Sequence, residues 1–525
     1  MNRILIKGGT VISAAQDSMP ARRDLLIEGE RISRIDRAIR APGARLLHAE
    51  GLVVAPGFID VHSHSDMPAL LDSTAQGRVA DGVTTEINGN CGFSLFPLAG
   101  PVERQRRASL REKGIEARWD DAAGYFAQVE SFGTGINRGF LVGHGAVRAA
   151  VMGYEAKAAN NTQLRRMQGL LAESLEQGAL GFSSGLCYPP GCFAEKRELA
   201  ELCRPLARTG RPYCTHVRSE GRALMASVRE SLGAAESSGA SLHISHVKTL
   251  GRANWRKIGA LERAILRARG SGANVTCDRY PYLAAMTDLA SIFPNWLSAG
   301  GKERALARLS NRADRARLKK ALGASPAAQA RWDAIQISVA TKDTREFEGL
   351  TVREAAKRMG LEPCEAVFEL LLHSKMAVSA IFFDMCEENL ERILRWPFVY
   401  IGSDSSARSL EGPTAEGKPH PRTFGSFARF LGEYVRRRKL ISLPEAIARI
   451  TSLPAARFGL KDRGLLRQGA YADIAVFDPK TIRDTATYAK PFSLSEGVRH
   501  LIVNGRFVLC DGRQTRERPG RVLRA

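Results

Sequence analysis

The sequence lacks a long apolar run, a pattern of paired cysteines and a leader-like beginning. No stretch approaches the roughly 20 apolar residues that a membrane-spanning helix needs. The first nine residues pass almost directly into a strand-like pattern, without the apolar stretch and small-residue cleavage site of a signal peptide. The nine cysteines are odd in number and form no C-x-x-C pair, which argues against a disulfide framework. We therefore expect a protein of the reducing cytoplasm that has no membrane partner.

Negative charge is also in short supply. The chain has 77 lysines and arginines against 55 aspartates and glutamates, which gives a net charge of +22. Such a balance can indicate nucleic-acid binding, but the sequence has no basic tail and no basic stripe interleaved with aromatic residues. The densest basic patches, residues 304–320 and 436–439, have the pattern of solvated helix faces. We therefore expect no nucleic-acid partner, and we interpret the charge as an attraction for small anionic substrates.

Length and composition predict a large globular protein built from more than one unit. With 525 residues, 44% of them apolar, the chain can form two or three domains or one large barrel with additions. Residues 1–56 have the pattern of short β-strands. Residues 441–525 have a helix followed by similar strands, with turn dipeptides such as Asn504-Gly505. We predict that both chain ends build one small β-domain, with a larger domain inserted between them.

Between these ends, short apolar strands alternate with helical patterns. The eight expected strands are at residues 57–61, 84–87, 139–142, 181–182, 211–215, 241–244, 274–277 and 399–401. The clearest helical patterns between them are at residues 161–177, 222–237 and 255–269. This alternation predicts an α/β fold, a (β/α)8 TIM-like barrel, over residues 57–440. The stretch from about 287 to 350, with a charged helix expected at 302–322, is predicted to be an inserted subdomain.

Side chains able to bind a metal follow several of these strands, at the end where a TIM barrel has its active site. They are His62, His64, Cys91, His216, His246 and Asp404. His62 and His64 are two residues apart, so on an extended strand both side chains point the same way and can chelate one divalent ion. A single pair of this kind is weak support, because polar residues in a loop can have the same spacing. The recurrence of metal-binding residues after several strands makes coincidence a poor explanation, and we predict a metal centre.

Two segments resemble signatures of the amidohydrolase superfamily of metal-dependent hydrolases. They are residues 55–64, APGFIDVHSH, and residues 469–477, GAYADIAVF. Within this superfamily the chain is most similar to the N-acyl-D-amino-acid deacylases, or D-aminoacylases. The segments that carry this resemblance are residues 82–85, 89–94, 181–191, 215–218, 243–248, 278–282, 402–404 and 420–427. The resemblance implies hydrolysis of N-acyl-D-amino acids to a D-amino acid and a carboxylate.

The resemblance also implies a set of metal ligands. Many members of the superfamily bridge two metals with a carboxylated lysine on the fourth strand, but residues 179–184 contain no lysine. D-aminoacylases use a cysteine after the second strand instead. The residues so implied for one tightly held Zn²⁺ are Cys91, His216 and His246. Those implied for a weaker second metal position are His62, His64, Asp404 and the shared Cys91.

The chemistry implied for the reaction is attack of a metal-activated water on the acyl carbonyl. Asp404 is the candidate general acid and base, because a carboxylate beside such a water can accept its proton and pass it to the departing amine. Arg422 is the candidate for binding the substrate's α-carboxylate, since a guanidinium offers two parallel hydrogen bonds. The resemblance adds Lys248 and Tyr280 as substrate-binding residues. Met286 stands where family members tend to carry a small polar residue, which leaves the preferred side chain open.

Several questions stay open at the level of sequence. His243 lies three residues before His246, on the opposite strand face, and we interpret it as structural or as a support for the site. His144 follows the third strand and has no assigned role. A cyclic amidase similar to dihydroorotase or hydantoinase is the nearest alternative function, and a non-catalytic assembly protein is a further one. The acyl group, the metal stoichiometry and the oligomeric state are not determined.

Overall fold

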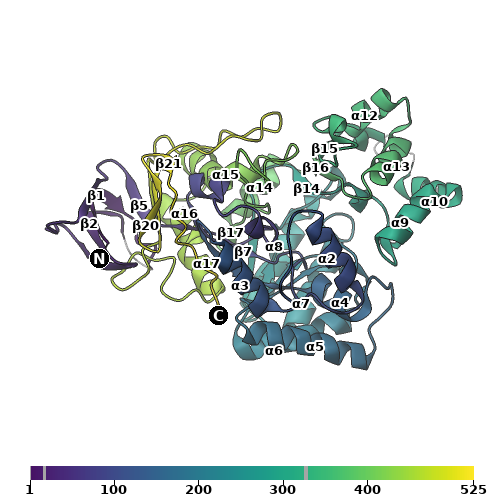
Figure 1. Ribbon diagram of the computed structural model, residues 1–525, viewed down its shortest axis with the longest axis horizontal. Helices are drawn as coiled ribbons and strands as arrows, with labels where there is room; N and C mark the ends of the chain where they lie inside the picture. Colours follow the sequence, from purple (N-terminus) through teal and green to yellow (C-terminus); the bar gives the residue numbers. More distant parts are fainter. Residues whose placement is uncertain (1, 16–18, 324–328) are drawn as a thin grey trace.

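The two ends of the chain form one sheet, as the sequence predicts (Figure 1). The computed structural model describes residues 2–15, 19–323 and 329–525. Among these, nine strands form a mixed sheet in the order β21-β20-β19-β18-β5-β1-β2-β3, with β4 beside β1. The strands are β1 (Arg3–Val11), β2 (Ala21–Glu28), β3 (Arg31–Asp36), β4 (Arg45–His48), β5 (Val53–Pro56), β18 (Ile474–Phe477), β19 (Val498–Val503), β20 (Arg506–Cys510) and β21 (Arg513–Gln514). Antiparallel pairing of β5 with β18, with Val54 opposite Val476, joins the N-terminal strands to the C-terminal ones.

The larger unit is a parallel barrel made from two sheets that meet. The strands are β6 (Phe58–Asp60), β7 (Val83–Asn88), β8 (Asn137–Phe140), β9 (Val142–Gly143), β10 (Phe182–Gly185), β11 (Tyr213–His216), β12 (Leu242–Ile244), β13 (Val275–Arg279) and β17 (Val399–Ile401). β8 and β9 are two halves of one strand interrupted at Leu141, so the described chain has eight barrel strands. The barrel closes where Ser63, just after β6, pairs with Ser405, just after β17. The predicted fold class is confirmed.

Helices cover the outside of the barrel (Figure 1). They are α1 (Gln76–Ala80), α2 (Glu103–Arg111), α3 (Ala122–Phe132), α4 (His144–Met152), α5 (Asn161–Glu176), α6 (Lys196–Thr209), α7 (Leu224–Ser238), α8 (Ile258–Gly270), α14 (Glu387–Arg395), α15 (Arg422–Arg429), α16 (Leu443–Ile450) and α17 (Ser452–Arg457). In α5, Leu164, Met167, Leu171 and Leu175 are buried at the three- and four-residue spacing of a helix face. This face packs into the same apolar cluster as Phe182 of β10.

A subdomain between β13 and β17 has its own sheet and its own apolar core, and projects beside the mouth of the barrel (Figure 1). Its elements are β14 (Ala285–Asp288), β15 (Ile335–Val339), β16 (Ser379–Phe382), α9 (Lys302–Ser310), α10 (Arg312–Leu322), α12 (Val352–Met359) and α13 (Pro363–His373). Strand β16 pairs with both β14 and β15, so this sheet also uses residues beyond the predicted end near 350. The division into domains at residues 57, 287, 350 and 441 stays a prediction, and residues 324–328 lie outside the described part.

The charged helix expected at 302–322 is two helices. The break falls at Asn311, whose backbone is extended, with φ −91° and ψ 125°. The Asn311 side chain accepts a hydrogen bond from the backbone N–H of Asp314 and so caps the start of α10. Asparagine competes well for this position because its short side chain satisfies a free N–H of the first turn. The prediction of one continuous helix was therefore wrong at this residue.

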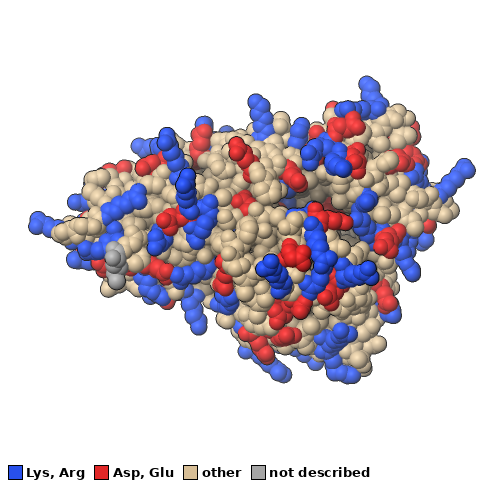
Figure 2. Space-filling model, in the orientation of Figure 1, with Lys and Arg blue, Asp and Glu red and all other residues tan. Residues whose placement is uncertain are grey.

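On the face shown in Figure 2, Lys and Arg side chains are scattered among Asp and Glu side chains and do not form a single basic stripe. Within residues 2–15, 19–323 and 329–525, no helix combines the length and the apolar character needed to cross a bilayer. The expected cytoplasmic location and the expected lack of a nucleic-acid partner stay predictions.

A buried ionic network lies beneath the carboxyl end of the first barrel strands. Glu86 of β7 pairs with Arg138 of β8 and, at 3.5 Å, with Nε of Arg78. Arg78 Nε is also 3.3 Å from Asp60 at the end of β6, and all four side chains are fully buried. Glu86 accepts a hydrogen bond of 2.9 Å from the hydroxyl of Ser63, beside His62 and His64. The network therefore supports the backbone that carries the first two histidines.

Replacing Arg138 by methionine should destabilise the protein strongly, because Glu86 would lose one of its two buried cations. Breaking a buried ion pair by removing one partner typically costs about 3–5 kcal/mol of unfolding free energy. Arg34→Met is the matched control, since Arg34 pairs with Asp36 at the exposed surface, where a pair contributes about 1 kcal/mol or less. Chemical denaturation of both variants measures the difference, and equal losses would contradict a structural role for the buried network.

Candidate metal centre and active site

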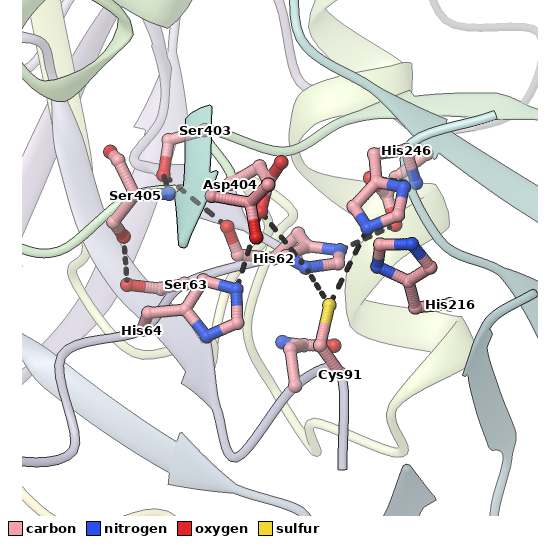
Figure 3. A network of polar contacts seen from close by, with 12 residues as sticks. His62, Ser63, His64, Cys91, His216, His246, Ser403, Asp404 and Ser405 are labelled. Atoms are coloured by element: carbon pink, nitrogen blue, oxygen red, sulfur yellow. Dashed lines mark hydrogen bonds and ion pairs between the residues drawn. The ribbon is translucent and has the colours of Figure 1, made fainter. Parts of the chain in front are cut away.

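The six side chains predicted as metal ligands converge at the carboxyl ends of the barrel strands (Figure 3). They form two groups whose possible ligand atoms all lie within 4.8 Å of one another. One group contains Cys91, His216 and His246, and the other contains His62, His64, Cys91 and Asp404. The sulfur of Cys91 is shared between them, 3.4 Å from Nε2 of His246 and 3.3 Å from Nε2 of His62.

Cys91 reaches this position because the loop after β7 turns tightly under the barrel mouth. Gly89 and Gly92, on either side of it, both have positive φ angles, of 74° and 78°. A Cβ atom on Gly89 would lie 2.2 Å from the carbonyl oxygen of Leu141, and one on Gly92 would lie 2.7 Å from the Gly185 nitrogen. Only glycine therefore fits at both positions. The hydroxyl of Ser183 accepts a hydrogen bond of 3.0 Å from the Gly92 N–H, so the fourth strand holds the loop that carries the thiol.

Three of the converging residues have a left-handed backbone, which L-residues other than glycine rarely adopt. The φ angle is 52° at Cys91, 35° at His246 and 49° at Asp404. Such conformations cost of the order of 1–3 kcal/mol each and concentrate at functional sites, where the surrounding structure enforces them. Here the strain turns a sulfur, an imidazole and a carboxylate from three different strand ends toward one point.

Asp278, at the end of β13, orients the histidines of two strands. Its Oδ2 atom is 3.0 Å from Nδ1 of His62 and 3.0 Å from Nε2 of His243, and its Oδ1 accepts the backbone N–H of His246. Burial disfavours ionisation of Asp278, but the charge and hydrogen bonds of the two imidazoles outweigh burial and lower its pKa. His62 thus donates its Nδ1 proton to a carboxylate, and its Nε2 faces Cys91 and, at 3.5 Å, Oδ1 of Asp404.

Glu220 has the same role on the other side. Its Oε1 atom is 2.9 Å from Nδ1 of His246 and also pairs with Lys248. Burial would raise the pKa of Glu220, but Lys248 and then the neighbouring histidines lower it, so the carboxylate is ionised. Nε2 of His216 lies 3.8 Å from Glu220, whereas Nδ1 of His216 is buried and has no hydrogen-bond partner in the described part of the chain. An unpartnered buried nitrogen of this kind is open to a metal.

Asp404 links the second group to the predicted substrate-binding arginine. Its Oδ1 atom lies 3.2 Å from Nε2 of His64, and its Oδ2 atom lies 3.0 Å from Nη1 of Arg422. Burial would raise the pKa of Asp404, but the charge of Arg422 and then of His246 holds it well below its usual range. The guanidinium of Arg422 lies 4.4 Å from the centre of the Tyr280 ring, and its Nη2 donates to the carbonyl oxygen of Met286 at 3.3 Å.

Arg422 and the predicted metal ligands other than His62 line a cavity of about 1600 Å³. The inserted subdomain supplies a further part of the wall, with Met286 and Thr287 of β14 among the lining residues. The hydroxyl of Thr287 lies 2.7 Å from that of Tyr188, which belongs to the barrel, so a hydrogen bond joins the two walls. Barrel and subdomain therefore enclose the site together.

The donor set fits zinc. A tetrahedral Zn²⁺ with bonds of about 2.0–2.3 Å to nitrogen and sulfur requires donor atoms roughly 3.3–3.8 Å apart, and the sulfur–nitrogen distances at Cys91 are 3.3 and 3.4 Å. Burial, and then the charge of Asp404, raise the pKa of the Cys91 thiol well above its usual range. A thiolate at this place therefore needs a compensating cation, which a bound metal provides.

Comparison with known proteins agrees with this geometry. Residues 45–509 match the family described as the amidohydrolase family. The chain is 37% identical to an N-acyl-D-glutamate deacylase of Alcaligenes xylosoxydans xylosoxydans, over 99% of this chain and 96% of that protein. It is 34% identical to a D-aminoacylase of the same organism, over 99% of this chain and 97% of that protein. The chain belongs to the amidohydrolase family, among the N-acyl-D-amino-acid deacylases.

Solved structures place this amidohydrolase in the same group. An N-acyl-D-glutamate deacylase of Bordetella bronchiseptica, crystallised with zinc and a phosphonate mimic of the tetrahedral intermediate, superposes with a TM-score of 0.84 at 33% identity, and 99% of each chain is covered. A D-aminoacylase superposes with a TM-score of 0.82 at 32% identity, again over 99% of each chain.

The remaining residues singled out from the sequence differ in whether they line the cavity. Lys248 lines the cavity, but its amine is already paired with Glu220. Tyr280 is fully buried and supports Arg422 with its ring, so direct contact with substrate stays a prediction for this residue. Nε2 of His243 contacts Asp278 at 3.0 Å, and its interpretation as a structural or supporting residue stays a prediction. His144 lies away from the described cavity lining, with Nε2 2.8 Å from Glu198.

Two supporting carboxylates were missed by sequence reasoning. Asp278 had a usable signal, because it follows a predicted strand inside one of the segments that resemble the family. Glu220 had none, since it lies in a loop four residues after His216 and nothing in its spacing marks it.

Replacing Glu220 by glutamine should weaken zinc binding by about 10- to 100-fold, the usual effect of losing a carboxylate that orients a metal-binding histidine. His246 would lose the acceptor that fixes its ring, and Lys248 would lose its counter-ion. Competition between apo-protein and a chromophoric chelator for Zn²⁺ measures the affinity. Glu262→Gln is the control, because Glu262 pairs with Arg392 on the outside of the barrel, and a similar loss in both variants would refute the orienting role.

Proposed function

We propose that this protein hydrolyses N-acyl-D-amino acids to a D-amino acid and a carboxylate, with zinc as its metal. The observation that carries the proposal is the shared Cys91 thiol, which joins a His216–His246 pair to an Asp404 carboxylate on the wall of one cavity. The names of the relatives, N-acyl-D-glutamate deacylase, D-aminoacylase and N-acyl-D-aspartate deacylase, support the same reaction class. The proposed partner is thus a small molecule.

We infer that Cys91, His216 and His246 hold the essential zinc. The buried, unpartnered Nδ1 of His216 and the carboxylate support of His246 favour this set for tight binding. His62 and His64, with Asp404 and the shared sulfur, form the weaker second position, since His64 is partly exposed and Asp404 is also engaged by Arg422. When bound, zinc supplies Lewis acidity and lowers the pKa of a nearby water.

Asp404 is the residue we propose to move the proton. Because Arg422 and His246 keep its pKa low, the carboxylate is ionised at neutral pH and ready to accept a proton from the attacking water. The same carboxyl group, once protonated, is placed to give that proton to the amine nitrogen as the C–N bond breaks. An amine leaves poorly unless it is protonated, so one carboxyl group can serve both steps.

Arg422 is the proposed anchor for the α-carboxylate. It lies at the cavity wall beside Asp404, and Nε is buried without a hydrogen-bond partner in the described structure. The Tyr280 ring beneath the guanidinium holds its plane, which favours the two parallel hydrogen bonds that a carboxylate accepts. The anchor would hold the α-carboxylate beside Asp404.

Asp404→Asn should lower kcat by about 100- to 10,000-fold, the usual contribution of a positioned acid–base group. The fold and the zinc at Cys91, His216 and His246 should remain. Asp511→Asn is a matched control, because Asp511 also has a left-handed backbone, with φ 49°, but lies in the small β-domain. Steady-state kinetics and metal content measure both variants, and a fully active Asp404→Asn enzyme would refute the assignment.

The function itself is tested by a substrate panel on the zinc-loaded protein. We expect release of free amine from N-acetyl-D-amino acids and none from the L-enantiomers, together with one tightly bound zinc per chain. The panel includes acidic, neutral and aromatic side chains, and dihydroorotate and hydantoin as cyclic amides. Turnover of the cyclic amides alone would support a cyclic amidase instead, and no turnover of any D-substrate would overturn the proposal.

A further inference from the structure

One buried histidine outside the metal centre, His420, contacts both the backbone of Arg422 and the segment just before β14. Nδ1 of His420 accepts the backbone N–H of Arg422 at 3.0 Å. Nε2 of the same ring lies 2.9 Å from the carbonyl oxygen of Ala284. Ala284 is two residues before Met286, whose own carbonyl oxygen accepts a hydrogen bond from Nη2 of Arg422. One imidazole therefore joins the residue that carries the guanidinium to the strand that holds it.

The hydrogen bonds of His420 determine which ring nitrogen carries the proton. Since Nδ1 accepts a backbone N–H, it carries no proton, and Nε2 must be the nitrogen that donates to Ala284. Burial, and then the charge of Arg422, hold the pKa of His420 well below its usual range, so the ring stays neutral. A neutral ring with this tautomer makes both bonds at the same time.

The surroundings of His420 keep the ring from turning. It is fully buried, and the rings of Tyr282 and Tyr488 lie 5.2 and 5.1 Å away, both nearly perpendicular to it. Tyr488 belongs to the loop between β18 and β19, so the small β-domain also contributes to this cage. His420 is absent from the described cavity lining and lies behind Arg422, which is part of that lining.

We infer that His420 is a positioning residue for the proposed deacylase reaction. It sets the place of the Arg422 guanidinium by linking the backbone of Arg422 to the carbonyl of Ala284, just before β14. This inference rests on the proposed function, because it assumes that Arg422 binds the substrate's α-carboxylate. Its expected signature is a loss of substrate binding rather than a loss of the chemical step.

His420→Ala should raise KM for N-acetyl-D-amino acids by about 10- to 100-fold, because small misplacements of a binding group have effects of this size. The value of kcat should change by less than about threefold, since Asp404 and the metal ligands keep their places. His420→Asn should restore part of the loss, because the amide oxygen of asparagine can replace Nδ1 as the acceptor. If the alanine variant does not fold, the asparagine variant carries the same comparison.

A double substitution shows whether the effect passes through Arg422. In an Arg422→Met background, His420→Ala should change KM by no more than about twofold, because the group that it positions is already gone. His500→Ala is the matched control. His500 is also buried and its Nδ1 also accepts a backbone N–H, from Asp511 at 3.2 Å, but it lies on β19 in the small β-domain. We expect this variant to keep the wild-type KM.

The outcomes are distinguishable. Wild-type protein that hydrolyses no N-acyl-D-amino acid would overturn the proposed function and this inference with it. An active wild type in which His420→Ala lowers kcat and leaves KM unchanged would overturn the inference alone. So would an undiminished His420→Ala effect in the Arg422→Met background, or an equal rise in KM for His500→Ala.

Discussion

The site depends on the placement of one sulfur atom. Cys91 lies between Nε2 of His62 and Nε2 of His246, and it belongs to both groups of possible metal ligands. Its left-handed backbone belongs to a tight turn, and the glycines at 89 and 92 permit that turn because a Cβ atom at either position would clash with neighbouring backbone. A buried thiol with a raised pKa is a poor ligand until a cation arrives. The fold therefore places the sulfur and the histidine nitrogens close together, and a bound metal would supply the positive charge that stabilises the thiolate.

Around this sulfur, buried carboxylates orient the imidazoles. Asp278 fixes His62 and the backbone of His246, and Glu220 fixes the ring of His246. Each carboxylate keeps its charge although it is buried, because histidines or a lysine compensate it. A histidine that donates one ring proton to a carboxylate presents its other nitrogen as a lone pair, which is the form that binds zinc. The imidazole rings are thus oriented before any metal is present.

The second constraint concerns Arg422, which receives support from three parts of the chain. Its backbone is at the start of α15, its guanidinium contacts Met286 of the inserted subdomain, and the β-domain loop cages His420 behind it. Any residue at position 286 could bind the arginine in this way, because the acceptor is the backbone carbonyl oxygen and not the side chain. The side chain of Met286 is then free to shape the cavity wall, where family members tend to have a smaller residue.

The sequence by itself determined the strand–helix alternation, the shared β-domain and the residue types at the strand ends, because periodicity and position at a barrel's carboxyl edge are local properties. Only the tertiary structure decided which side chains support which. His62 and Asp278 are 216 residues apart in the chain, and no local pattern relates them. The link from His420 to Ala284, 136 residues away, likewise depends on packing between distant segments. The break of the charged helix at Asn311 differs, because its cap on Asp314 is a local feature that the sequence contains.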